Sequence, residues 1–120
     1  MASLIHKNFD TPDEIRPITN GKVEVVGLGE VSAMRLTFEP GWQWSKDVKP
    51  VANTGSCQVH HIGYQISGRL GARLDDGTEI EVGPGEAYNI PPGHDGWVIG
   101  DEAVVSVDFR GAENYAKPQS

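Results

Sequence analysis

The chain has 120 residues, of which 38% are hydrophobic and 22% are charged, and its formal net charge is −7. This composition is that of one ordered globular domain, because disordered chains contain fewer apolar residues. The 10 lysines and arginines form no run, which excludes a nucleic-acid phosphate backbone as a partner. No segment approaches the roughly 18 apolar residues of a membrane span. The polar first ten residues do not match a signal peptide, and the single cysteine cannot form an internal disulfide. We therefore expect a cytoplasmic protein.

The 15 glycines and 8 prolines separate short segments at regular spacing, which is typical of an all-β sandwich or barrel. We expect an edge strand at 4–9, a turn or helix cap at 11–14, and a loop at 42–55 that forms a lid or covers the core. The segment 91–96 is predicted to be a turn, because it is rich in proline and glycine. No helix longer than two turns is predicted, although 111–116 fits one helical turn. The strands are expected at 22–28, 31–38, 56–67, 70–74, 78–82, 87–90, 97–99 and 103–109.

Four motifs in the second half of the chain resemble those of the small single-domain cupins. They are Tyr64-Gln65-Ile66-Ser67-Gly68-Arg69-Leu70, Asp76-Gly77-Thr78, Gly83-Pro84-Gly85-Glu86-Ala87 and Ile90-Pro91-Pro92-Gly93. The resemblance spans roughly residues 39–109 and implies an all-β cupin fold, the double-stranded β-helix or jelly-roll barrel, in a single domain. It implies N-terminal strands at 1–30 packed on the barrel, the cupin barrel at 31–110 and a C-terminal tail at 111–120. Because cupins commonly dimerise through an outer sheet face, it also implies a homodimer.

The metal ligands of the cupins are not matched in this sequence. Counting back from Gly68 places His61 at the position of the usual glutamate, while His94 lies two residues before the position of the last usual histidine. The other usual ligand positions fall on Cys57 or Ser56, on Gly55 or Thr54, and on Gly96. The resemblance therefore does not support a standard centre of three histidines and one glutamate around iron or manganese.

The central segment has two faces, because residues of equal parity in a regular strand point the same way. The resemblance places the face of His61 inside the barrel, together with Cys57, Val59, Gly63 and Gln65. An unpaired Gln65 amide would cost about 1–3 kcal/mol there, so a polar partner or a ligand should meet it. The opposite face is expected to pack against the N-terminal strands or a second subunit, and its apolar members are Ile62, Tyr64 and Ile66.

Three interpretations of the site stay open. In the first, Cys57, His61 and His94 hold one divalent transition metal, which would be zinc, iron, nickel or manganese, in a non-standard arrangement. In the second, the cavity is metal-free and binds a small organic molecule through histidines and aromatic walls. The ligand contacts would then come from His61, His94, Gln65, Asp95, Trp42, Trp44, Tyr88 and Trp97. In the third, His94 and Asp95 only shape their turn and Cys57 is a small buried apolar residue.

The sequence does not favour a nucleophilic pair of Cys57 and His61. Same-face residues four apart in a regular strand are separated by about 13 Å, which is too far for a direct hydrogen bond. His61 with His94 is therefore the expected core of any site. As an enzyme, the protein would use His61 as a metal ligand or as the catalytic general acid or base. The alternative is a metal-free module that binds or senses a small molecule without catalytic activity.

Overall fold

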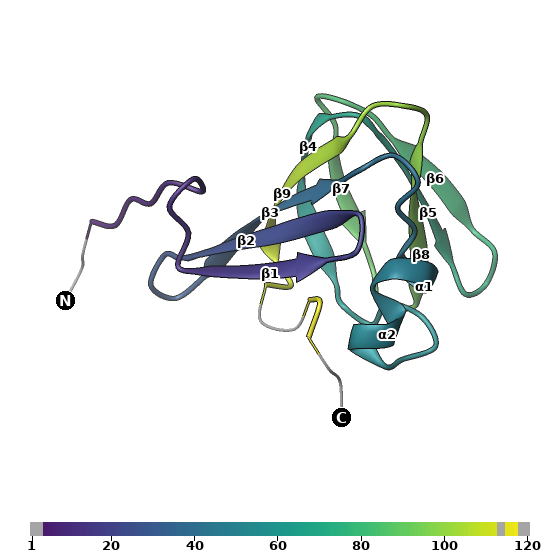
Figure 1. The fold of residues 1–120 in the computed structure, drawn as a ribbon, viewed down its shortest axis with the longest axis horizontal. Coiled ribbons are helices and arrows are strands. Elements are labelled where there is room, and N and C mark those ends of the chain that lie inside the picture. The colour runs from purple at the N-terminus through teal and green to yellow at the C-terminus, as the bar shows by residue number, and fades with distance from the viewer. Residues whose placement is uncertain (1–3, 113–114, 118–120) are drawn as a thin grey trace.

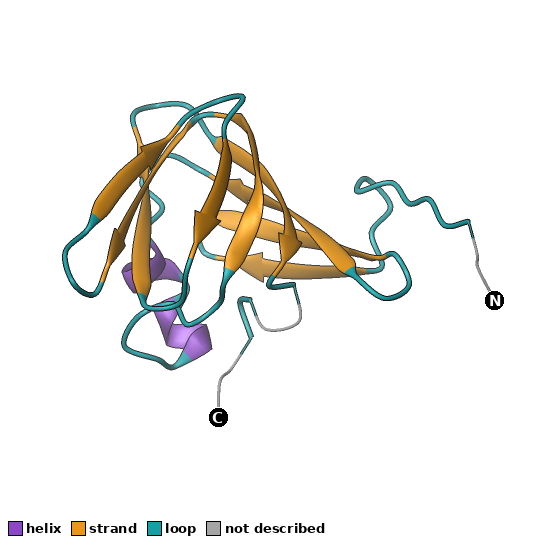
Figure 2. Ribbon diagram, turned by 180° about the vertical axis from the view of Figure 1, so that it is seen from behind, coloured by secondary structure: helices purple, strands orange, loops and turns teal. Residues whose placement is uncertain are grey.

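The computed structural model describes residues 4–112 and 115–117, which form two antiparallel sheets with two short helices at one end (Figures 1 and 2). A six-stranded sheet has the order β1-β2-β3-β9-β4-β7, and a three-stranded sheet has the order β6-β5-β8. The elements are β1 (Glu14–Ile18), β2 (Gly21–Gly27), β3 (Ser32–Phe38), α1 (Trp44–Asp47), α2 (Lys49–Ala52), β4 (His61–Ser67), β5 (Arg69–Leu74), β6 (Glu79–Val82), β7 (Ala87–Ile90), β8 (His94–Ile99) and β9 (Val104–Arg110).

Gly68 carries the chain from β4 in the large sheet into β5 in the small one. Its φ of +75° lies in the left-handed region, and an added Cβ would overlap the carbonyl oxygen of Ala103. Only glycine fits both conditions without strain. The corner at Gly68 therefore joins the two sheets around a common interior.

The interior is filled by the inward face of each strand. Burial alternates residue by residue from Cys57 to Ile66, so the predicted parity of this segment is confirmed. The cluster at the centre combines aliphatic side chains of the large sheet with aromatic ones, and its largest part consists of Val23, Val25, Met34, Leu36, Phe38, Trp42, Trp44, Val48, Cys57, Val59, Leu70, Val104 and Tyr115.

Several predicted boundaries were wrong. No strand forms at 4–9; instead β1 occupies Glu14–Ile18, and its Glu14 pairs with Val25 of β2. The central strand begins at His61 rather than at residue 56. The turn at 91–96 ends early, because His94 already pairs with Leu74 in the ladder between β5 and β8. The helical turn expected at 111–116 includes residues 113 and 114, which lie outside the described part of the chain.

The segment 42–55, expected to be a loop, contains α1 and α2. Trp44, Val48 and Ala52 recur every four residues and are all buried, which gives the two helices one apolar stripe against the core. Pro50 lies in the first turn of α2, where its missing N–H costs nothing. Asn53 ends α2 in the left-handed conformation.

The outer face of β4 is not covered by the N-terminal strands. Those strands extend the large sheet at its β3 edge, and Ile62, Tyr64 and Ile66 are 39%, 47% and 50% exposed. Packing against the N-terminal strands is therefore wrong for this face, while packing against a second subunit stays a prediction. Within the described residues, no helix is long and apolar enough to cross a membrane.

Candidate metal centre

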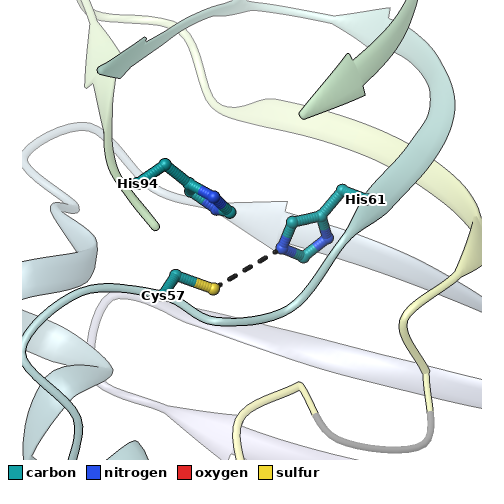
Figure 3. A group of neighbouring side chains, drawn as sticks. All are labelled: Cys57, His61 and His94. Carbon is teal, nitrogen blue, oxygen red and sulfur yellow. Dashed lines mark hydrogen bonds between the residues drawn. The ribbon is translucent and has the colours of Figure 1, made fainter. Parts of the chain in front are cut away.

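Cys57, His61 of the large sheet and His94 of the small sheet come together, with their side chains directed toward one another (Figure 3). Each offers one ligand atom, and these three atoms all lie within 4.8 Å of one another. Sγ of Cys57 is 3.7 Å from Nε2 of His61. All three side chains are buried. The structure thus brings together the three residues that the sequence suggested as metal ligands.

A single backbone bridge holds Cys57 against His94. The N–H of Cys57 donates to the carbonyl oxygen of His94 at 2.7 Å, and the N–H of Gly93 donates to the carbonyl oxygen of Cys57 at 2.7 Å. His61 and His94 are the first residues of β4 and β8, which belong to different sheets. The bridge therefore ties the segment just before β4 to the first residue of β8, next to His61.

The rejection of a direct contact between Cys57 and His61 was wrong. It assumed one regular strand through both residues, but 58–60 adopt no strand and β4 begins only at His61. Outside a regular strand, the backbone rise of about 13 Å no longer applies, and Sγ of Cys57 and Nε2 of His61 lie 3.7 Å apart. The alternation of buried and exposed residues is kept all the same.

Asp108 of β9 fixes the orientation of His61. Its Oδ2 lies 2.6 Å from Nδ1 of His61, and its Oδ1 accepts a hydrogen bond from the hydroxyl of Tyr88. Asp108 is fully buried. Because a carboxylate only accepts, Nδ1 of His61 carries the proton and Nε2 faces Cys57.

His94 is oriented in the same way by a backbone group. Its Nδ1 lies 2.7 Å from the carbonyl oxygen of Pro91, which can only accept a hydrogen bond. Its Nε2 is therefore the nitrogen left for a ligand. The rings of His61 and His94 lie edge to face with their centroids 5.2 Å apart.

The cluster shifts the pKa values of its members. Burial alone raises the pKa of the Cys57 thiol, but hydrogen bonds from His61 and His94 outweigh burial and lower it to about 6. Burial lowers the pKa of His61, but its bonds to Asp108 and Cys57 outweigh burial and raise it to about 9. Burial, followed by neighbouring negative charge, raises the pKa values of Tyr88 and Tyr115. The hydrogen bond between Cys57 and His61 thus favours the thiolate form of Cys57 and the protonated form of His61.

A small cavity, partly open to solvent, adjoins the two histidines. Its volume for the centres of water-sized groups is about 40 Å³, which is room for about three such groups. Trp42, Trp44 and Tyr88, all suggested from the sequence as ligand contacts, form part of its wall. The polar lining residues are His61, Tyr88, His94, Ser106, Asp108 and Tyr115. The other lining residues are Leu36, Phe38, Trp42, Trp44, Leu70, Ala72, Ile90 and Gly96.

Three other suggested ligand contacts lie outside this wall. Gln65 is fully buried, but its amide donates to the carbonyl oxygen of Gly68 and accepts from Ser106, so the chain itself supplies the predicted polar partner. The carboxylate of Asp95 accepts from the Gln43 amide and from the N–H of Ser45. Trp97 packs on the backbone of Gly71 and beside Arg73.

Asp108 and Ser106 were not suggested from the sequence. Their signal was the alternation in β9, where Val104, Ser106 and Asp108 share the buried face and two of the three are polar. A carboxylate on the inward face of a strand needs a partner, and in this chain the partner is His61.

Comparisons with known proteins identify the fold. No family model matches the chain, and no curated protein matches it in sequence. Among solved structures, a protein of unknown function from Rhizobium leguminosarum shares 20% identity at a TM-score of 0.58, with 83% of each chain covered. A cupin-like protein from Thermotoga maritima shares 18% at 0.54, covering 78% of this chain and 70% of that one. A cupin domain from Bordetella pertussis shares 17% at 0.51, covering 76% and 92%. The protein therefore has a single-domain cupin fold, as its sequence motifs predicted.

Proposed function

We propose that the protein binds one divalent transition metal ion through Sγ of Cys57, Nε2 of His61 and Nε2 of His94. The observation that carries this proposal is the convergence of three ligand atoms within 4.8 Å on buried side chains. In a tetrahedral zinc site, a thiolate sulfur and an imidazole nitrogen are about 3.6 Å apart, given bond lengths of about 2.3 and 2.05 Å. The separation of Sγ and Nε2 in Cys57 and His61 is 3.7 Å.

The surroundings of the two histidines support the same proposal. Histidines that bind metals usually donate their second ring N–H to a carboxylate or a backbone carbonyl, which orients the ring. Asp108 has this role for His61 and the carbonyl group of Pro91 has it for His94. Two histidines oriented independently toward one thiol argue against a chance cluster.

The donor set favours zinc over the other candidate ions. One thiolate and two imidazoles suit zinc and the later first-row metals, while manganese and magnesium prefer oxygen ligands. This set differs from the three histidines and one glutamate of the usual cupin centre. Among the described residues, no fourth histidine, cysteine or carboxylate joins the group. Three protein ligands with one position left for water or substrate are typical of catalytic rather than structural zinc sites.

A metal in this position would polarise an oxygen of a small substrate or lower the pKa of a bound water. His61 would then serve as a ligand and not as a general base, because both of its ring nitrogens would be engaged. The proposed role of the chain is to hold the ion, to orient His61 through Asp108 and to enclose the substrate between apolar walls.

Cys57, His61 and Asp108 also have the order of a thiol nucleophile, its base and the carboxylate that orients the base. We favour metal binding, because Cys57 is only 2% exposed and is not part of the cavity wall. An electrophile in the cavity would therefore meet the histidines before the sulfur. The remaining candidate is a metal-free module that binds a small molecule without catalytic activity.

Cobalt(II) substitution tests the proposed ligand set. The metal-free protein is titrated with cobalt while the near-ultraviolet and visible spectra are recorded. We expect a thiolate-to-cobalt charge-transfer band together with the intense visible bands of a tetrahedral ion. Cys57→Ser should abolish the charge-transfer band, and His61→Ala or His94→Ala should abolish tight binding. His60→Ala is the matched control, because His60 is bonded to Asn89 outside the cluster. Spectra of free cobalt throughout would refute the proposal.

A further inference from the structure

Arg16 is a buried arginine in β1, at the edge of the large sheet. It is the only buried residue of that strand and is 7% exposed. Its Nε and Nη2 donate to the two carboxylate oxygens of Glu14 at 2.8 and 3.1 Å, and its Nη1 donates to the carbonyl oxygen of Tyr115 at 2.7 Å. Burying a charged side chain is costly unless it is paired and hydrogen-bonded. The bond that distinguishes Arg16 from a surface ion pair is therefore the inward one to Tyr115.

The chain turns at Gly111, directly after β9, and this turn places Tyr115 in the interior. Gly111 has a φ of +109°, and a Cβ there would overlap the side chain of Val59 and the carbonyl oxygen of His60. Only glycine avoids both conflicts without strain. The N–H of Tyr115 then donates to the carbonyl oxygen of Gly111 at 3.1 Å. After the turn, the side chain of Tyr115 is only 3% exposed.

Tyr115 lies against the candidate metal ligands. Its ring is edge-on to the ring of His61, with the centroids 5.0 Å apart and an angle of 77° between the planes. It also forms part of the wall of the cavity beside His61 and His94. Burial, followed by the negative charge of Cys57, raises the pKa of Tyr115, which agrees with a position near the thiol. One residue thus connects Arg16, at the sheet edge, with the ligand cluster.

We propose that Arg16 is a positioning residue of the metal centre, because it holds Tyr115 over His61 and Cys57 and so limits the access of solvent and metal to the cluster. The bond between the guanidinium of Arg16 and the carbonyl oxygen of Tyr115 is called the clamp below. The inference rests on the proposed function for the role of the cluster as a metal site. The clamp itself involves no metal, so it also protects the thiol of the metal-free protein.

Removing the clamp should make the cluster more accessible without displacing its ligands. A buried group reacts from the small population of molecules in which its cover is open. Loss of a hydrogen bond from a charged donor should raise this population about ten-fold or more. Zinc would enter and leave through the same opening, so both rates should rise together while the affinity stays nearly unchanged.

The first measurement is the rate at which iodoacetamide alkylates Cys57, the only cysteine, in the metal-free whole chain, followed by mass spectrometry. We expect Arg16→Met and Tyr115→Ala each to raise this rate about ten-fold or more. The double variant should be no faster than the faster single variant, because both changes open the same cover. Arg35→Met is the control, because Arg35 lies in the same sheet and its guanidinium bonds to two carboxylates and not to Tyr115.

The second measurement is the rate of zinc uptake and the rate of zinc release to excess chelator, both followed with a chromogenic indicator. We expect Arg16→Met to raise both rates about ten-fold or more, with little change in affinity. Arg35→Met should change neither rate. If Arg16→Met fails to fold, Glu14→Gln serves instead, because Glu14 is partly exposed and pairs with Arg16. It should raise the alkylation and exchange rates about two- to five-fold, in keeping with a weakened exposed ion pair.

The two measurements separate the clamp from the metal centre. Faster alkylation of Arg16→Met, in a protein that binds no zinc, would leave the clamp standing and refute the proposed function. Zinc binding with unaltered alkylation and exchange rates in Arg16→Met would do the reverse. An equal acceleration in Arg35→Met, or a double variant in which the two single effects multiply, would overturn the inference. Faster alkylation with unaltered zinc exchange would also overturn it, because the ion would then reach the cluster by another path.

Discussion

Asp108 lies 2.6 Å from Nδ1 of His61, and this contact turns Nε2 of the same ring toward the sulfur of Cys57. Asp108 comes from β9, 47 residues after His61, and reaches it because β9 and β4 are neighbours in the large sheet. Its other oxygen is bonded to Tyr88 of β7, on the far side of β4. Three adjacent strands therefore determine the orientation of one candidate ligand.

Asp108→Asn should weaken metal binding without unfolding the protein. The amide keeps the shape of the carboxylate but loses its negative charge, and replacing a group that orients a metal-binding histidine costs about 10- to 100-fold in affinity. Competition with a chromogenic chelator measures the affinity, and circular dichroism monitors the fold. Asp101→Asn is the control at an exposed aspartate of the same chain. An unchanged affinity would show that the bond between Asp108 and His61 has no role in the site.

Gly63→Ala should disturb the contact between Asp108 and His61, because Gly63 lies against Asp108. A methyl group at Gly63 would overlap the carbonyl oxygen of Val107 and Oδ1 of Asp108. We expect a loss of about 1–3 kcal/mol in the free energy of unfolding, together with weaker metal binding. Urea denaturation measures the first and chelator competition the second. Gly55→Ala is the control, because nothing lies within 4 Å of its added methyl. A Gly63→Ala protein as stable as that control would contradict the close packing of Gly63 against β9.

Gln65→Leu should separate stability from binding. The substitution leaves the buried Ser106 hydroxyl without its acceptor, at a cost of about 1–3 kcal/mol in unfolding free energy. Metal affinity should stay the same, because Gln65 does not line the cavity. Gln58→Leu, at an exposed glutamine outside the cavity wall, is the control for changing the side-chain type. A Gln65→Leu protein that loses metal binding but keeps its stability would show that Gln65 takes part in binding.

The prediction of a homodimer concerns the outer face of β4. Tyr64 is flanked on that face by Ile62 and Ile66, and Phe109 of the neighbouring β9 is 57% exposed. If a second copy covers this face, Tyr64→Glu should give monomers in sedimentation, because the association would bury an unpaired charge. Ile80→Glu is the control at an exposed apolar residue of the other sheet. An equal mass for wild type and Tyr64→Glu in sedimentation would show that the outer face of β4 is not a subunit interface.

The sequence predicted the fold and three residues of the site, Cys57, His61 and His94, but not the contacts between them. Glycine and proline punctuation located most strands, and the period of two placed Cys57, His61 and Gln65 on the buried face. The contact between Cys57 and His61 was missed, because β4 begins only at His61 and Cys57 pairs instead with His94 in an isolated bridge. Asp108 was missed, because its partner is distant in sequence and is brought close only by strand pairing.

The other residues predicted to line the cavity were also only partly correct. Trp44 was identified as a wall residue, yet the helical spacing of Trp44, Val48 and Ala52 was overlooked among polar neighbours. Asp95 was expected in the cavity because it is adjacent to His94, and Trp97 because aromatic residues commonly line pockets. In β8, however, the side chain of Trp97 packs on β5, and that of Asp95 is bonded to residues before and within α1.

The most direct test of the metal centre is elemental analysis of purified, untagged protein after incubation with zinc and removal of the excess. We expect about one zinc ion per chain, because the three ligands form a single site. Cys57→Ala, His61→Ala and His94→Ala should each lose it while remaining folded, and His60→Ala should retain it. A protein that holds no zinc, iron, nickel or manganese after this treatment, or that holds it equally well in all four variants, would contradict the proposed centre.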